Sequence, residues 1–142
     1  MDHRIVLLDQ IHYKAYLALM NEFRPVNTSM SLDDFREFLT QIPNIYVYIS
    51  PNNDKPIASI TIMIEQKFIH NSGRVGHIED LYVAKGYRSV GIGGKMLEFS
   101  KEYCRRERCY KMILYCDENL MSYYKTKEFE EYGMTMKYNL NY

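Results

Sequence analysis

Hydrophobic residues recur along the chain with two periods, one typical of helices and one typical of strands. Apolar positions three to four residues apart predict helices over about residues 11–23, 32–42 and 91–106, and a short helix over 119–127. Runs rich in β-branched and aromatic residues predict strands over 4–8, 45–50, 56–64, 75–83, 110–116 and 132–140. The expected order is therefore strand, two helices, three strands, helix, strand, helix and a last strand.

Helix-capping and turn-forming residues support these element boundaries. Ser31 is a suitable N-cap, with Asp33 and Asp34 in the first turn of the second helix, which we expect to end at Pro43. Residues 51–54 predict the turn of a hairpin, and polar residues 71–74 break the chain before the next strand. Early hairpins followed by a late strand-helix-strand crossover predict a mixed sheet covered by helices, in a single domain over residues 1–142.

Composition limits the possible partners and compartments. The 18 basic and 18 acidic residues cancel, so the chain lacks the broad charge typical of nucleic-acid-binding or membrane-surface proteins. Apolar runs are too short for a signal peptide or a membrane span. The three cysteines form no Cys-x-x-Cys pair, which suits a reducing compartment. We expect a cytoplasmic protein that binds neither nucleic acid nor membrane.

A glycine-rich segment follows the strand that ends near Val83 and opens the helix near Gly91. Glycines let backbone N–H groups converge on an anion, and a helix N-terminus adds unsatisfied donors and partial positive charge. Arg88 and Lys95 add formal charge, and an arginine fork can bind two phosphate oxygens. The segment matches neither a Walker loop nor a dinucleotide fingerprint. It predicts a diphosphate-binding turn over residues 88–95.

Glu79 and Asp80 are adjacent carboxylates within an otherwise apolar strand. Neighbouring strand positions point to opposite faces, so we expect at least one of them to reach the interior or a cleft, either in a functional role or satisfied by a buried cation. The four histidines, His3, His12, His70 and His77, have no metal-ligand spacing, so no metal site is expected. No serine or cysteine nucleophile signature occurs either, which favours direct transfer.

Arg88-x-x-Gly91-x-Gly93 after a hydrophobic strand resembles the acetyl-CoA signature of the GNAT superfamily of N-acetyltransferases. The resemblance implies an α+β fold with a mixed, mostly antiparallel sheet of about six to seven strands and about four helices. It implies acetyl-CoA as cosubstrate, with its pantetheine arm paired to the backbone of one strand. The implied coenzyme contacts are Leu81, Tyr82, Val83, Arg88, Ser89, Val90, Gly91, Ile92, Gly93, Gly94, Lys95, Tyr124, Lys125 and Thr126.

Three further stretches, 65–70, 76–81 and 109–114, are similar to the glucosamine-6-phosphate N-acetyltransferase branch of that family. This resemblance implies acetyl transfer to the amine of an amino-sugar phosphate, toward activated N-acetylglucosamine, by a homodimer whose sites use both subunits. The implied acceptor contacts are Lys67, Phe68, Ile69, His70, Glu79, Asp80, Leu81, Tyr110 and Lys111. The branch also carries a threonine near the first interhelical loop and a late arginine, which falls at Asn139 here, and we expect Arg24 or Lys137 to compensate for them.

Tyr124 matches the tyrosine of the family that assists departure of the coenzyme thiol, with Tyr123 as the competing position. We hypothesise that its hydroxyl protonates or hydrogen-bonds the sulfur, while Glu79 and Asp80 complete the catalytic set. Tyr115 and Leu120 stand where the family usually has an acidic residue and an asparagine. Two alternatives follow: an acetyltransferase acting on a protein or polyamine amine, and a non-catalytic acyl-CoA-binding module.

Overall fold

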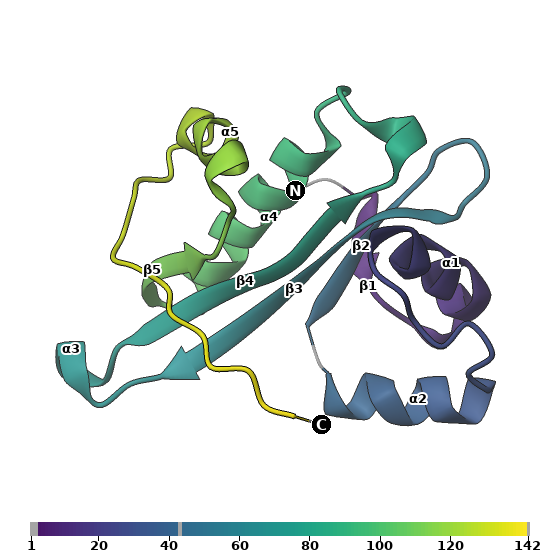
Figure 1. Cartoon of the computed structure of the whole chain (residues 1–142), viewed down its shortest axis with the longest axis horizontal. Coiled ribbons are helices and arrows are strands. Elements are labelled where there is room, and N and C mark those ends of the chain that lie inside the picture. Colours follow the sequence, from purple (N-terminus) through teal and green to yellow (C-terminus); the bar gives the residue numbers. More distant parts are fainter. Residues whose placement is uncertain (1–2, 43, 142) are drawn as a thin grey trace.

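The computed structural model describes residues 3–42 and 44–141 and contains one sheet of five strands. The strands lie side by side in chain order: β1 (Ile5–Leu7), β2 (Ile45–Ile49), β3 (Pro56–Gln66), β4 (Arg74–Val83) and β5 (Cys109–Leu114) (Figure 1). The first four are antiparallel, and β5 runs parallel to β4. The crossover between β4 and β5 contains the helix that follows the glycine-rich turn. The predicted α+β class with a mixed, mostly antiparallel sheet is confirmed.

Five α-helices accompany the sheet in the described residues: α1 (Tyr13–Phe23), α2 (Leu32–Gln41), α3 (Ile69–Ser72), α4 (Ile92–Arg106) and α5 (Met121–Thr126). Single 3-10 turns precede α1, the glycine-rich segment and α5, at Gln10–His12, Lys85–Tyr87 and Glu118–Leu120. The predicted cap of α2 is confirmed, because the Ser31 hydroxyl accepts from the Asp34 amide (3.1 Å). The predicted end of this helix at Pro43 falls outside the described residues.

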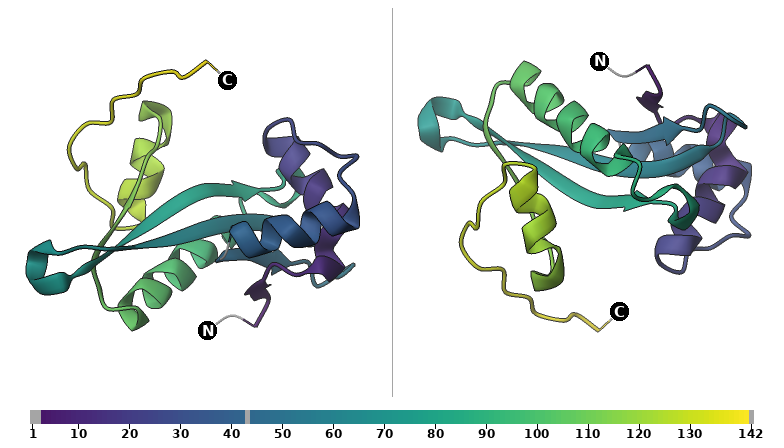
Figure 2. Two further views of the ribbon diagram at one scale, coloured as in Figure 1. Left: turned by 90° about the horizontal axis from the view of Figure 1, so that it is seen from below. Right: turned by 90° about the horizontal axis from the view of Figure 1, so that it is seen from above.

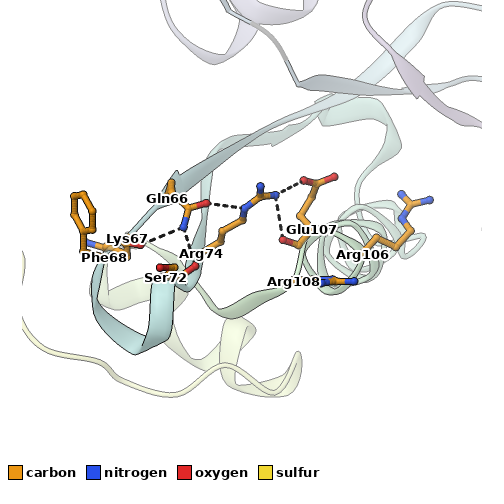
Figure 3. Close-up of a pocket in the computed structure, with 8 residues that line it drawn as sticks. All are labelled: Gln66, Lys67, Phe68, Ser72, Arg74, Arg106, Glu107 and Arg108. Carbon is orange, nitrogen blue, oxygen red and sulfur yellow. Dashed lines mark hydrogen bonds and ion pairs between the residues drawn. The ribbon is translucent and has the colours of Figure 1, made fainter.

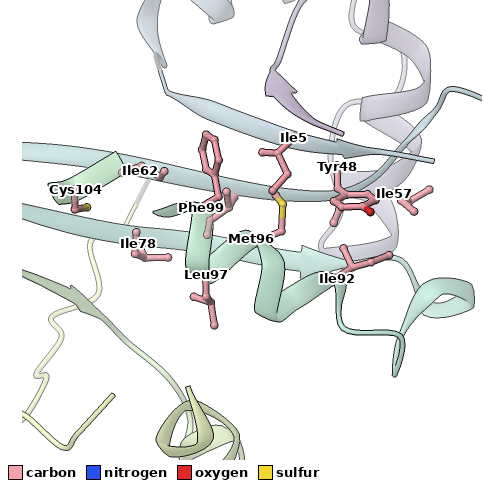
Figure 4. Close-up of a cluster of buried hydrophobic side chains, with 12 residues drawn as sticks. Ile5, Tyr48, Ile57, Ile62, Ile78, Ile92, Met96, Leu97, Phe99 and Cys104 are labelled. Atoms are coloured by element: carbon pink, nitrogen blue, oxygen red, sulfur yellow. The ribbon is translucent and has the colours of Figure 1, made fainter. Parts of the chain in front are cut away.

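Two apolar layers hold the helices on the sheet. On one face, α4 buries Met96, Leu97 and Phe99 against Ile62 and Ile78 (Figure 4). A second cluster joins α1 and α2 to β2 and β4 through Leu17, Phe35, Val47 and Tyr82, so these helices cover the other face. Figure 2 shows α4 lying along one side of the sheet. Alternation along each strand thus supplies both layers.

The predicted last strand, Tyr132–Leu140, is absent. Residues 130–141 have no regular secondary structure, and Tyr132, Met134, Met136, Tyr138 and Leu140 are all exposed. A strand exists only as part of a hydrogen-bonded ladder, and within the described residues this segment has no partner strand. The described sheet therefore has five strands instead of the expected six to seven.

A bulge interrupts β4 at the paired carboxylates. Thr61 pairs with Glu79 and Ser59 with Tyr82, so Ile60 of β3 faces two residues, and Asp80 has a left-handed φ of 51°. Beyond this point β4 also loses its other neighbour, because its pairing with β5 ends at Ile78 and Leu114. The chain from Glu79 to Val83 therefore presents one strand edge that β5 does not cover.

Gly76 provides a test of the contact between β4 and α4. A Cβ at this position would lie 2.3 Å from Cys104 Sγ, and burial raises the pKa of that thiol to about 12. We expect Gly76→Ala to lower the free energy of unfolding by about 1–3 kcal/mol through overpacking, as measured by urea denaturation. Adding Cys104→Ala should recover part of the loss, and Gly86→Ala is the matched control because nothing lies within 4 Å of its Cβ. Equal stability of Gly76→Ala and wild type would contradict the contact.

Candidate active site

The glycine-rich turn joins the free end of β4 to the first turn of α4. Ser89 and Gly91 adopt left-handed φ angles of 66° and 86°, which glycine tolerates at Gly91 without cost. Helix α4 begins at Ile92, whose side chain is buried while Val90 is exposed. The first amide groups of α4 thus stand next to a glycine-containing turn, which is an arrangement that binds phosphate.

The glycines after Gly91 allow α5 to approach this turn closely. A Cβ on Gly93 would lie 2.7 Å from Tyr123 Oη, and one on Gly94 would lie 3.0 Å from Lys127 Nζ. Lys127 therefore adds a cation beside the start of α4 that the sequence interpretation missed. The ammonium group of Lys95 is turned toward β2, 5.7 Å from the centre of the Tyr48 ring. Gly93 and Gly94 in the first turn of α4 were the sequence feature that could have predicted the close approach of another segment, here Lys127.

Arg88 is held at the end of β4. Its Nε donates to the Val83 carbonyl (3.0 Å), and its guanidinium lies 5.2 Å from the centre of the Tyr82 ring. Tyr82 Oη donates to Glu22 Oε2 (2.7 Å), and the Lys85 amide donates to the same oxygen (3.1 Å). The hydrogen bond from Tyr82 is the main reason that the pKa of Glu22 is lowered. These hydrogen bonds connect the end of β4 and the turn to Glu22 of α1. No sequence motif indicated this role of Glu22.

A cleft of about 870 Å³ opens where β5 diverges from β4. Its walls come from β4, the second half of α4, β5, α5 and the segment after α5. Among the predicted site residues, the cleft contains Glu79, Tyr110, Lys111, Tyr124 and Lys125. His77 and Lys101 line it as well, although the sequence interpretation did not include them. Lys111 Nζ contacts Tyr132 Oη (2.6 Å), which ties the last segment across the cleft.

Tyr124 lies at the base of this cleft, packed by neighbouring rings. The Phe129 and Tyr123 ring centres are 5.9 Å and 5.2 Å from its own, both edge to face. Burial, with a smaller contribution from Tyr123, raises the pKa of the Tyr124 hydroxyl. The group therefore stays protonated at neutral pH and can donate a hydrogen bond. Lys125 pairs with Glu131 (3.7 Å), and the Thr126 hydroxyl bonds the Tyr123 carbonyl (2.5 Å).

Other predicted acceptor residues lie apart from the cleft. The tip of the β3–β4 hairpin carries Phe68 and Ile69 exposed, while the His70 ring stacks on Tyr110 at 4.1 Å. Lys67 Nζ pairs with Glu65 (3.0 Å). The stack on Tyr110 thus links the hairpin tip to the cleft wall.

Asp80 and Arg24 are not brought into the cleft. Glu79 reaches the cleft as expected, but both adjacent carboxylates are exposed and neither is buried in the interior. The bulge breaks the alternation on which the prediction rested, and Asp80 lies near Tyr16, whose pKa is raised mainly by burial and further by the Asp80 charge. Arg24 ends α1 and donates to the Phe23 carbonyl (3.0 Å).

The match to known proteins agrees with this arrangement. A model of the acetyltransferase (GNAT) family matches residues 13–129. The chain belongs to this family. The predicted resemblance to it is confirmed, and the chain is an acetyl-CoA-dependent N-acetyltransferase. Its glycine turn and the free edge of β4 fit a coenzyme diphosphate and pantetheine arm, which the residues above could hold.

Several relatives of this GNAT protein have assigned activities. A glucosamine 6-phosphate N-acetyltransferase of Arabidopsis thaliana is 40% identical over 119 residues, which cover 79% of each chain. Another from Candida albicans is 30% identical over 112 residues, or 75% of each chain. The crystal structure of the glucosamine-6-phosphate N-acetyltransferase from Arabidopsis thaliana matches with a TM-score of 0.88 and 27% identity, covering 96% of this chain and 97% of that chain.

Two further features concern the described residues only. Across residues 3–42 and 44–141, no helix is both long and apolar enough to cross a membrane. In the same part of the chain, no three His, Cys, Asp or Glu side chains come together as metal ligands would.

Proposed function

We propose that this GNAT enzyme transfers the acetyl group of acetyl-CoA to the amine of glucosamine 6-phosphate. The products would be N-acetylglucosamine 6-phosphate and coenzyme A, a step toward activated N-acetylglucosamine. The assigned activity of the Arabidopsis and Candida relatives supports this acceptor. The observation that carries the proposal is the single cleft that gathers Glu79, Lys111 and Tyr124 from three different elements.

The chain's own residues suggest how each substrate would be placed. The amides at the start of α4, with Arg88 and Lys127 beside them, would bind the coenzyme diphosphate. The open edge of β4 at Leu81–Val83 would accept hydrogen bonds from the pantetheine arm and donate others to it. The Lys111 ammonium would bind the sugar phosphate, and the Glu79 carboxylate would hold the amine or a hydroxyl.

Bound acetyl-CoA would supply the activated thioester that the neutral sugar amine attacks. Holding the two substrates in one cleft replaces a bimolecular encounter with an oriented one. Tyr124 would donate a hydrogen bond to the sulfur as negative charge develops there, since its raised pKa keeps the hydroxyl protonated. The proton that the amine loses ends on the thiol, so Tyr124 is unchanged after each turnover.

Release of free thiol from acetyl-CoA tests the proposed acceptor. We expect purified protein to release coenzyme A with glucosamine 6-phosphate at a kcat/KM at least about tenfold above that with glucosamine, one charged contact being worth about 1.5–3 kcal/mol. A polyamine and a peptide serve as further acceptors, and Lys111→Gln should narrow the difference between the two sugars. Equal rates with both sugars would refute the phosphate contact, and coenzyme binding without thiol release would favour an acyl-CoA-binding module.

We also propose that the enzyme is a homodimer joined through its last segment. Every second residue from Tyr132 to Leu140 is a large apolar side chain, and these five are 69–95% exposed. Such alternation gives a strand one apolar face, which a lone chain leaves in water. Within the described sheet, the outer edge of β5 is unpaired. A second copy would offer both a strand edge and an apolar surface to this segment.

Light scattering after size exclusion checks the dimer. The full chain is expected to elute with twice the mass of one chain, and a variant lacking residues 131–142 is expected to elute as a monomer. Met134→Ser with Met136→Ser is the milder test, because it keeps the length and removes only apolar contacts. A monomeric full chain at micromolar concentration would contradict the proposal.

A further inference from the structure

A second pocket lies at the far end of the β3–β4 hairpin, next to the C-terminal end of α4. Its volume is about 660 Å³, within the range of small-molecule sites. Eight residues line it: Gln66, Lys67, Phe68, Ser72, Arg74, Arg106, Glu107 and Arg108 (Figure 3). None of them lines the cleft between β4 and β5.

The guanidinium group of Arg74 and the His77 side chain of the cleft wall lie on opposite faces of the sheet. Gln66 and Arg74 are cross-strand partners, and the Arg74 guanidinium reaches Glu107 just after α4, so both side chains are on the α4 face. Neighbouring strand positions point the opposite way. Glu65 accordingly lies on the other face, where it binds His77 of the cleft wall and the Lys67 ammonium. Arg74, Arg106 and Arg108 therefore line a pocket whose residues are not shared with the cleft.

Arginine is the main charged residue of this pocket. Arg74, Arg106 and Arg108 line it together with Glu107, whereas the Lys67 ammonium is paired with Glu65 on the other face of the sheet. The Glu107 carboxylate is already used by Arg74 (3.0 Å). Within the described part of the chain, neither Arg106 nor Arg108 forms an ion pair, and the Arg106 guanidinium lies 5.9 Å from the centre of the Tyr103 ring. Within the described residues, Arg106 and Arg108 are therefore the two charges of the pocket that no carboxylate neutralises.

Arg74 and Arg108 are placed in ways that suit an anion. Gln66 Oε1 accepts from Arg74 Nε (3.0 Å) and Glu107 accepts from Nη1, so the Arg74 guanidinium is fixed in place (Figure 3). Arg108 follows the last turn of α4 with a left-handed φ of 59°, a position that glycine fills most easily. The fold thus holds an arginine where a residue without a side chain would be less strained.

We propose that this pocket binds a small anion that carries a diphosphate group. Guanidinium groups bind phosphate oxygens in pairs, and two adjacent phosphates would engage Arg106 and Arg108 together while Arg74 orients the nearer one. One phosphate would fill only a fraction of the available volume. The proposal does not depend on the acceptor proposed above, because it rests on Arg74, Arg106 and Arg108, which are not among the predicted acceptor contacts.

Titration of the full chain with inorganic pyrophosphate, followed by proton–nitrogen NMR, tests the site. We expect saturable shifts at the amides of residues 106–108 and at Arg74 Nε, with an affinity about tenfold above that for orthophosphate. The same spectra report the amides of residues 88–95, so binding at the coenzyme turn is read separately. Shifts that grow linearly without saturating at residues 106–108 would overturn the proposal.

Three variants distinguish an effect on binding from an effect on folding. Arg106→Gln with Arg108→Gln should weaken pyrophosphate at this pocket about tenfold, whereas Lys14→Gln with Arg36→Gln removes the same charge from α1 and α2 and should leave it unchanged. Arg108→Gly should keep or raise the melting temperature, because glycine tolerates this φ, and still weaken binding. Wild-type affinity in Arg108→Gly and in the double variant would show that the arginines do not hold the anion.

Discussion

A Tyr124→Phe variant is expected to retain its affinity for acetyl-CoA while its kcat falls about a hundredfold. The aromatic ring packs against Phe129 and Tyr123, so the phenylalanine keeps the packing and removes only the hydroxyl. If that hydroxyl acts on the departing sulfur, its loss affects the transition state and not the bound coenzyme. Steady-state thiol release with glucosamine 6-phosphate, together with calorimetric binding of acetyl-CoA, measures the two quantities separately.

Tyr123→Phe is the matched control for this prediction. Tyr123 has the same side chain one residue earlier, but its hydroxyl is directed to Gly93 at the start of α4. Its loss should affect coenzyme affinity more than kcat. A Tyr124→Phe enzyme with wild-type kcat, or a Tyr123→Phe enzyme with the larger loss of kcat, would move the proton-donor role away from Tyr124.

Arg88→Gln is expected to weaken acetyl-CoA binding by about 10-fold to 100-fold, with a smaller effect on the KM for the sugar. Charge-assisted hydrogen bonds to a phosphate contribute about 1.5–3 kcal/mol, and glutamine keeps neither the charge nor the fork. In the structure Arg88 is held beside the turn by the Val83 carbonyl and the Tyr82 ring. Calorimetric titration with acetyl-CoA gives the dissociation constant directly.

Arg88→Lys and Arg36→Gln complete the Arg88 test. Lysine keeps the charge without the two-pronged geometry, so its affinity should fall between those of wild type and Arg88→Gln. Arg36→Gln removes a charge from the surface of α2 and should leave acetyl-CoA binding unchanged. An Arg88→Gln dissociation constant equal to that of wild type would exclude residue 88 from the diphosphate site.

Features that depend only on residues close together in the sequence could be predicted from it. The capping serine of α2, the apolar stripe of α4 and the glycine-rich turn were all predicted from residues close together in the chain. Each depends on side chain to backbone bonds or on periodicity within one element. The fold class followed from the order of such elements.

Features that depend on a distant partner could not be predicted in this way. Alternation from Tyr132 to Leu140 is correct for a strand, but it does not say which edge the strand would pair with. The bulge at Asp80 depends on the register of β3 against β4, which no residue in β4 alone reveals. The approach of Lys127 to Gly94 likewise joins segments more than thirty residues apart in the sequence.

Hydrogen exchange along the uncovered edge of β4 should also show whether coenzyme is bound. Between Glu79 and Val83, no described strand supplies the outward-facing amides with carbonyl partners on the β5 side, so solvent deuterium should replace their protons quickly. A pantetheine arm lying along this edge would complete the ladder and slow that replacement. The rate of deuterium uptake at these outward-facing amides would then follow how much of the enzyme carries coenzyme at each moment of turnover.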